Sequence, residues 1–238
     1  MEFKVLEELS PASASMYLGS DGHFLCKSGS IIATDPCYTH AEGVVKNCAT
    51  GKWTAYITKA LLEVWGHRVA ALWIFHEDAG DPASLLKPKW SFKNGELRVT
   101  TPWQEETSTG VDSGQAGFWD EKSYVRHRST HTEVIRAARG ERDAFYKYVC
   151  ANSDEGCYTE KPDGACSSSG CGDGAYLCRA VRDRSGLVMA MCLDYLQFIP
   201  AMFQRRALDG LDPKDLPKML GHVDILNEEW LAELIKGE

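Results

Sequence analysis

Four aspartates of the chain share a local setting that could support chemistry. Each lies in or beside a turn rich in Gly, Pro or Ser, next to a stretch with the composition of a strand: Asp35, Asp112, Asp120 and Asp173. If these turns converge, their carboxylates could bind a divalent cation or act in acid-base chemistry. Aspartate also favours turns because its side chain accepts hydrogen bonds from nearby backbone N–H groups. The pattern leaves both interpretations open, a shared acidic site and separate turn residues.

The chain contains 9 cysteines, which form a second set of candidates. An odd number cannot pair completely in disulfides within one chain, and the opening residues 1–10 have no apolar export signal, so we expect reduced thiols in a cytoplasmic protein. Only Cys166 and Cys171 have the short spacing of a zinc knuckle, and Cys37 with His40 is a second partial match. Free cysteines are also among the most buried residues. Zinc binding and burial both stay open, and the sequence identifies no cofactor.

A nucleophilic cysteine is a third possibility. Cys37 follows Pro36 at the end of a predicted strand, and His40, His67 and His76 precede the other motifs. A Cys–His pair must meet in space, which a sequence does not reveal. The chain has no phosphate-binding loop, dinucleotide fingerprint, nucleophile-elbow serine or H-E-x-x-H motif. No complete catalytic motif is therefore identified.

Strands must position most of these residues. Residues 165–196 read as a small-residue loop followed by a hairpin, whose second strand, 187–196, is apolar on both faces. Residues 68–76 have the same character, so both are predicted to be central, buried strands. The Asn94-Gly95 pair between two apolar runs predicts a hairpin. Further strands are predicted at 23–27, 30–34, 51–59, 175–181 and, as a bent strand, 110–120.

The predicted fold class is α+β, a β-rich sandwich or partly closed barrel over residues 1–200. Apolar residues at helical spacing predict one packed helix over 141–151. Capping residues predict a C-terminal helical appendage over 201–238. The β-rich domain could consist of two related hairpin units, about 23–100 and 110–200, because each contains a Gly-led strand that returns as a buried strand. Any two buried hairpins would look alike, so duplication stays open.

Charge and hydropathy narrow the class of partner. The formal net charge over 238 residues is -8, which argues against a general nucleic-acid binder and against an anionic membrane surface. No run of about 18 apolar residues exists that could span a membrane. A small molecule or a protein is the expected partner, and the oligomeric state stays open.

Three motifs occur in order along the chain. They are D-P-C-Y at 35–38, V-D-S-G-Q-A-G-F at 111–118 and S-G-C-G-D-G-A-Y at 169–176. Together they resemble a family of bacterial and phage proteins known only as a domain of unknown function. Each motif alone is short, and their order and spacing carry the resemblance.

The resemblance covers most of residues 31–196 and includes an aromatic-containing helix at 145–150. The chain departs from the family pattern at Cys171, where the family usually has an aromatic residue, which argues against a catalytic role for this cysteine. The resemblance implies no established activity or cofactor.

The motif residues are the predicted ligand-binding set: Asp35, Cys37, Tyr38, Asp112, Ser113, Gln115, Ser169, Asp173 and Tyr176. The first functional hypothesis is a non-enzymatic binding or regulatory protein of bacterial or phage type, which holds a small ligand or a protein partner at the motif loops. The second is a metal-dependent hydrolase using Asp35, Asp112 and Asp173. The third is a structural or assembly component that docks through its C-terminal helices.

Overall fold

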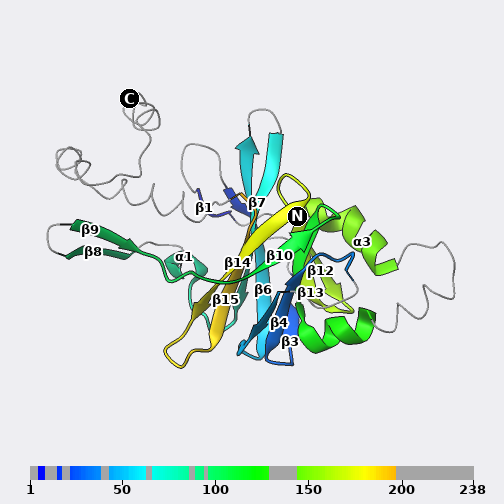
Figure 1. Cartoon of the computed structure of the whole chain (residues 1–238), viewed down its shortest axis with the longest axis horizontal. Coiled ribbons are helices and arrows are strands. Elements are labelled where there is room, and N and C mark those ends of the chain that lie inside the picture. The colour runs from blue at the N-terminus through cyan, green and yellow to red at the C-terminus, as the bar shows by residue number, and fades with distance from the viewer. Residues whose placement is uncertain are drawn as a thin grey trace.

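Strands make up most of the part of the chain that the structure describes. The computed structural model describes residues 5–8, 15–17, 22–38, 43–62, 66–85, 89–93, 96–128 and 144–196. Within these residues the strands form a larger sheet, a smaller sheet and a separate hairpin, as Figure 1 shows. Neighbouring strands in both sheets run antiparallel.

The larger sheet has the strand order β1-β2-β6-β7-β15-β14-β10, and β3 pairs with β6 beside this path. The two strands at its centre, β7 and β15, are the ones predicted to be central and buried, and that prediction is confirmed. The strands are β1 (Val5–Glu8), β2 (Ser15–Tyr17), β3 (Phe24–Cys26), β6 (Gly51–Leu62), β7 (Gly66–His76), β10 (Gln104–Val111), β14 (Gly174–Arg182) and β15 (Val188–Asp194).

The smaller sheet has the order β12-β13-β11-β4-β5. A separate hairpin of β8 and β9 brackets Asn94-Gly95 and confirms the prediction made from that pair. The strands are β4 (Ser30–Thr34), β5 (Val44–Lys46), β8 (Lys89–Lys93), β9 (Glu96–Thr100), β11 (Gln115–Asp120), β12 (Cys157–Glu160) and β13 (Asp163–Ser168).

The main core lies between the two sheets. Side chains alternate between the faces of a strand, so β7 sends Leu72 and Ile74 into this core. The smaller sheet contributes Ile31 and Phe118 to the same cluster. Residues of both sheets therefore share one apolar cluster, which the burial of apolar surface stabilises.

The other face of the larger sheet has an aromatic cluster of its own. Trp73 and Phe75 on β7 pack there with Trp103, and the Trp73 and Trp103 rings meet edge-on at 5.1 Å. The Trp103 indole donates to the Leu85 carbonyl oxygen (3.1 Å), which holds α1 (Pro82–Leu85) on this face. Two apolar layers around β7 explain why its sequence is apolar at successive positions.

Two helices cover the outer face of the smaller sheet. α3 (Ala144–Asn152) buries Phe145 and Val149 in a cluster with Trp119, which confirms the helix predicted over 141–151. A 3-10 turn, η1 (Ser153–Glu155), follows it. The second helix, residues 121–128, is not predicted by the sequence pattern.

The helix at residues 121–128 is started by a cap. Asp120 is 2% exposed, and its Oδ1 accepts a hydrogen bond from the Ser123 backbone N–H at 2.9 Å. This is the N-cap arrangement, which satisfies one of the free N–H groups at a helix start. Its buried face consists of Tyr124 and Arg128, and only the tyrosine is aromatic, so the helix has little apolar periodicity.

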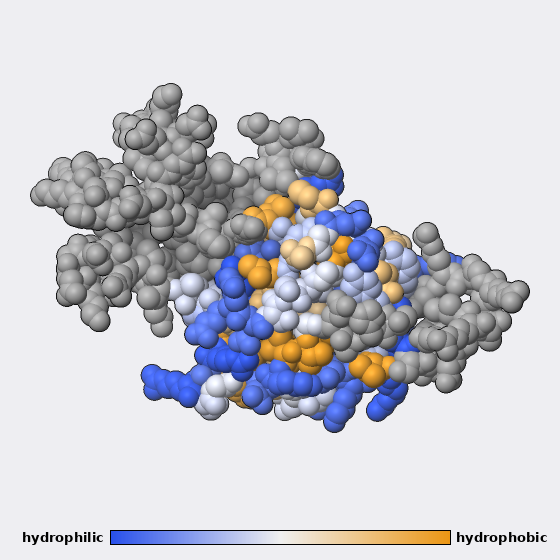
Figure 2. All heavy atoms as spheres, viewed as in Figure 1, coloured by the Kyte–Doolittle hydropathy of each residue, from blue (hydrophilic) through white to orange (hydrophobic). Residues whose placement is uncertain are grey.

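The β-rich character of the predicted fold is confirmed, and neither sheet closes into a barrel, because each ends in strands with a single neighbour. The predicted C-terminal helical appendage, 201–238, lies outside the described residues. Among those residues no helix is both long and apolar enough to cross a membrane. In the view of Figure 2, the described residues form a largely hydrophilic surface with small apolar patches between polar residues.

Candidate functional site

Asp35 joins the first two motif loops. This residue directly follows β4 and is fully buried. One oxygen accepts hydrogen bonds from the Cys37 N–H (2.6 Å) and the Ser113 hydroxyl (2.7 Å). The other accepts from the backbone N–H groups of Asp112 and Ser113, both at 2.8 Å. Four donors compensate the cost of burying this group, so Asp35 is a cross-link between the loops.

The helix at residues 121–128 is fastened to the first loop. The Tyr124 hydroxyl lies 2.8 Å from the Tyr38 carbonyl oxygen and donates to it, while the Arg128 Nε donates to the same oxygen at 3.1 Å. The Arg128 guanidinium also lies 5.6 Å from the centre of the Phe145 ring on α3. This arginine, 3% exposed, therefore contacts both the loop and the second helix.

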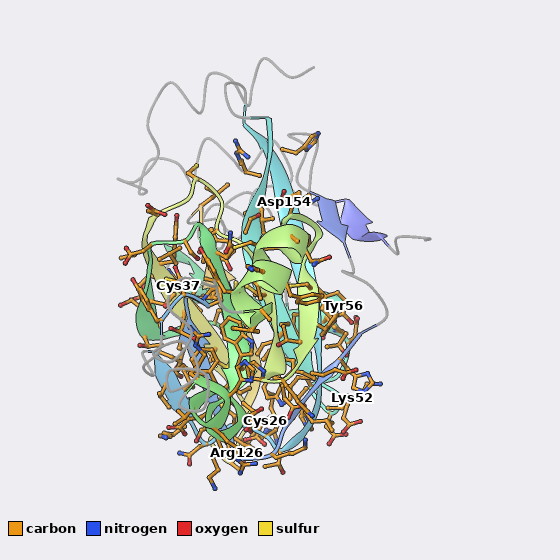
Figure 3. The ribbon with its side chains drawn as sticks, turned by 90° about the vertical axis from the view of Figure 1, so that its right-hand side faces the viewer. Cys26, Cys37, Lys52, Tyr56, Arg126 and Asp154 are labelled. Atoms are coloured by element: carbon orange, nitrogen blue, oxygen red, sulfur yellow. The ribbon has the colours of Figure 1, made fainter. Side chains whose placement is uncertain are left out.

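Cys37 is held as a thiol. Burial, a hydrogen bond with the Asp35 carboxylate and the charges of Asp35 and Asp112 raise the pKa of Cys37 to about 12. A nucleophilic cysteine needs the opposite shift, toward the thiolate. Of the three candidate histidines, His40, His67 and His76, the first lies outside the described residues. The environment of Cys37, marked in Figure 3, therefore argues against the nucleophile hypothesis.

α3 contacts the second motif loop. The Cys150 thiol donates to Gln115 Oε1 at 3.4 Å, and Ser113 Oγ lies 3.3 Å from the same oxygen. Burial and the neighbouring Cys150 raise the pKa of Tyr146 to about 12, and Tyr146 also hydrogen-bonds with Ser113. One face of α3 is therefore held by polar contacts to the loop.

The third motif loop lies against the second. The Ser169 N–H donates to the Gly114 carbonyl oxygen at 3.0 Å. The hydroxyls of Ser169 and Tyr176 both donate to the Gly172 carbonyl oxygen, at 2.8 and 2.7 Å. Asp173 is exposed at the tip of this loop. The loops converge, although most of the polar groups in them are used to hold the loops together.

The four aspartates named at the outset have different roles. Asp35 and Asp112 are neighbours, and Asp112 accepts a hydrogen bond from the Tyr38 hydroxyl at 2.9 Å. Asp120 caps a helix and does not belong to the loops. Although burial opposes its ionisation, backbone N–H groups of Ser123, Ser28 and Lys27 lower the pKa of Asp120. Across the described part of the chain, no group of three or more His, Cys, Asp or Glu side chains is arranged to hold a metal ion.

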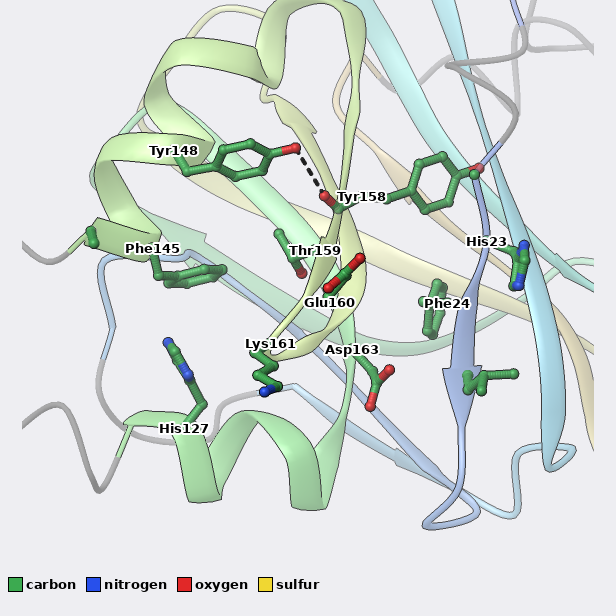
Figure 4. Close-up of a pocket in the computed structure, with 13 residues that line it drawn as sticks. His23, Phe24, His127, Phe145, Tyr148, Tyr158, Thr159, Glu160, Lys161 and Asp163 are labelled. Atoms are coloured by element: carbon green, nitrogen blue, oxygen red, sulfur yellow. Dashed lines mark hydrogen bonds between the residues drawn. The ribbon is translucent and has the colours of Figure 1, made fainter.

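The helices held by the motif loops also line a groove of about 850 Å³, drawn in Figure 4. His127 comes from the helix at residues 121–128, and Phe145 and Tyr148 come from α3. The opposite walls are β3 and β12, with the turn after β12. The groove is lined by these aromatic and polar side chains: His23, Phe24, His127, Phe145, Tyr148, Tyr158, Thr159, Glu160, Lys161 and Asp163.

Hydrogen bonds fix two of the groove's tyrosines. The Tyr148 hydroxyl donates to the Tyr158 carbonyl oxygen at 3.3 Å, although the Tyr148 residue is 48% exposed. The Tyr158 hydroxyl donates to the Ala55 carbonyl oxygen (3.1 Å) and accepts from the Ala55 N–H (2.9 Å), which ties β12 to β6. The groove therefore presents oriented aromatic surface.

A second hollow of about 620 Å³ continues the groove. The two share four lining residues, so they form one continuous depression: His127, Glu160, Lys161 and Asp163. The second hollow adds basic and hydroxyl side chains: Lys27, Ser28, Lys122, Ser123 and Arg126. Apart from Asp120, which lines the second hollow, none of the lining residues is a candidate from the sequence, since they come from separate segments and only their packing brings them together.

No protein-family model, no curated protein and no solved structure matches the chain significantly. The resemblance to a bacterial and phage family therefore stays a prediction.

Proposed function

We propose that the protein is a binding protein that holds a small molecule in the groove between α3, the helix at residues 121–128, β3 and β12. One observation carries the proposal. Each of the two helices uses one face to contact the motif loops and another to line the groove. The volume of the groove falls within the range of about 300–1,000 Å³ that is typical of ligand pockets.

The motif loops support this site. In the helix at residues 121–128, Tyr124 contacts the first loop and His127 lines the groove. In α3, Cys150 contacts the second loop and Tyr148 lines the groove. A ligand site needs walls held by a second layer of contacts, and the loops supply that layer. We further propose that the frame beneath it, two packed sheets, is a sandwich.

The contacts of Asp35 favour binding over metal-dependent hydrolysis. Both of its oxygens already accept two hydrogen bonds, so a metal ion could bind there only by breaking the link between two loops. Asp112 and Asp173 are exposed, which leaves direct binding at the motif loops as the second candidate. An assembly role through the C-terminal helices, a cytoplasmic location and a bacterial or phage origin all stay predictions.

A ligand-observed NMR screen of small aromatic fragments tests the proposal. We expect hits whose binding is lost in Tyr148→Ala, because this exposed ring lines the groove. The control Val125→Ala, a 42% exposed position on the helix at residues 121–128 that does not line the groove, should keep them. Hits that survive Tyr148→Ala but disappear in Asp112→Asn would place the site at the motif loops instead.

A further inference from the structure

We propose that the ligand of this groove is an anion with an aromatic or extended apolar body. The inference rests on the proposed function and deepens it, because it assigns a chemical class to the ligand. It follows from how charge and aromatic surface are divided along the depression.

The buried or paired acids of the depression are already compensated. Asp120 accepts hydrogen bonds from the backbone N–H groups of Lys27 (2.8 Å), Ser28 (2.7 Å) and Ser123 (2.9 Å). Asp163 pairs with the Lys27 ammonium group at 3.2 Å. A cationic ligand would have to compete with these internal donors.

The formal charges of the second hollow favour an anion. Its lining has the basic residues Lys27, Lys122, Arg126 and Lys161 and the acidic residues Asp120, Glu160 and Asp163, and both Lys122 and Lys161 are exposed. Four basic against three acidic side chains leave a surplus of one positive charge, although the whole chain carries a formal charge of -8. A local field of opposite sign to the net charge selects an anion and guides its approach.

The aromatic surface lies at the other end. Phe24, Phe145 and Tyr148 line only the larger groove, while Lys122 and Arg126 line only the second hollow. Figure 4 shows Phe145 and Tyr148 on α3 and Lys161 on the turn after β12, on different walls of the same depression. A ligand that spans both parts would place an apolar body on the rings and its charge near the lysines.

Two fluorescent probes that differ by one charged group test the inference. 8-Anilinonaphthalene-1-sulfonate is anionic, and N-phenyl-1-naphthylamine has the same ring system without the sulfonate. We expect the anionic probe to bind about tenfold more tightly, a difference of about 1.4 kcal/mol. Because exposed charges are screened by salt, this preference should shrink when ionic strength rises from about 0.02 M to about 0.5 M.

The preference should disappear in the double variant Lys122→Gln, Lys161→Gln. It should persist in Lys52→Gln, Lys147→Gln, which removes the same charge from exposed positions that line neither hollow. Both probes should bind more weakly to Tyr148→Ala. Circular dichroism melts of each variant serve as the control for folding.

The outcomes separate the two proposals. Equal affinities for both probes, or an anion preference that the groove lysines do not affect, would overturn the anion inference and leave a groove that binds apolar molecules. Binding that Tyr148→Ala does not weaken, or no binding of either probe, would overturn the proposed function and the inference together.

Discussion

Asp35 and Asp112 show how differently two turn aspartates of one cluster are used. Asp35 is fully buried and receives four hydrogen bonds, while Asp112 is exposed and receives one from Tyr38. In the sequence both stand beside a strand and a turn, and nothing nearby separates them. The convergence of their loops could be predicted from sequence, but the number of donors around each carboxylate could not, because the donors belong to distant segments.

The Asp35 cross-link should be necessary for stability. In Asp35→Asn an amide group replaces one acceptor and faces backbone N–H groups, which leaves buried donors unsatisfied. We expect a loss of about 3 kcal/mol in the free energy of unfolding, measured by urea denaturation. The control Asp112→Asn should lose less than about 1 kcal/mol, since that side chain is exposed. A small loss in Asp35→Asn would show that the loops are held by other contacts.

Asp120 should make part of the protein's stability depend on pH. Its pKa in the folded protein lies below the usual value of 3.8, so its contribution is complete above that pH and is lost as pH falls through the folded-state pKa. Melting temperatures of the wild type and Asp120→Asn should therefore differ at neutral pH and converge as the pH falls through the lowered pKa of Asp120. Asp173→Asn, an exposed control, should follow the wild type throughout. A constant gap would contradict this assignment.

Cysteine labelling tests the protonated state of Cys37. At pH near 7 we expect iodoacetamide to modify the exposed Cys150 and Cys171 before Cys37, because a thiol with a pKa raised to about 12 offers almost no thiolate. Mass spectrometry of peptides over a time course gives the order. Rapid labelling of Cys37 would restore the hypothesis of a nucleophilic cysteine.

At the scale of elements, apolar patterns in the sequence identify the strands and the helix whose faces are buried in the core. β7 and β15 are apolar at successive positions because both faces are buried, and α3 shows helical spacing because one face is buried. The helix at residues 121–128 lacks that signal because its inner face contacts loop carbonyls through Tyr124 and Arg128. The Asp120 cap with its N–H donor at Ser123 was the local signal that could have indicated it.

β7 provides a test at this scale. Leu72 is 1% exposed and lies in the core between the sheets, so Leu72→Ala should cost about 2–5 kcal/mol in the free energy of unfolding. Leu25 on β3 is 38% exposed, and Leu25→Ala should cost less than about 1 kcal/mol. Chemical denaturation measures both. Equal losses would mean that β7 does not occupy the centre of the fold.

For the whole molecule, the positions of two hairpins fit the predicted duplication. The hairpins β6–β7 and β14–β15 are neighbours in the larger sheet, where β7 pairs with β15. In the smaller sheet β4 and β13, which precede the first and third motif loops, flank the same strand β11. Each hairpin is thus matched by a strand in the facing sheet. Duplication stays a prediction, now with a specific pairing of segments.

The place of β15 has a consequence for biosynthesis. It is the last strand of the described residues and yet lies between β7 and β14, where Asp194 pairs with Ala71. While the ribosome extends the chain, one edge of β7 stays without its partner strand until residues 188–194 have emerged. Such edges favour association between nascent chains, and distant pairings form slowly. The larger sheet should therefore be completed only after β15 has emerged, and the exposed edge of β7 is a site where chaperones should act until then.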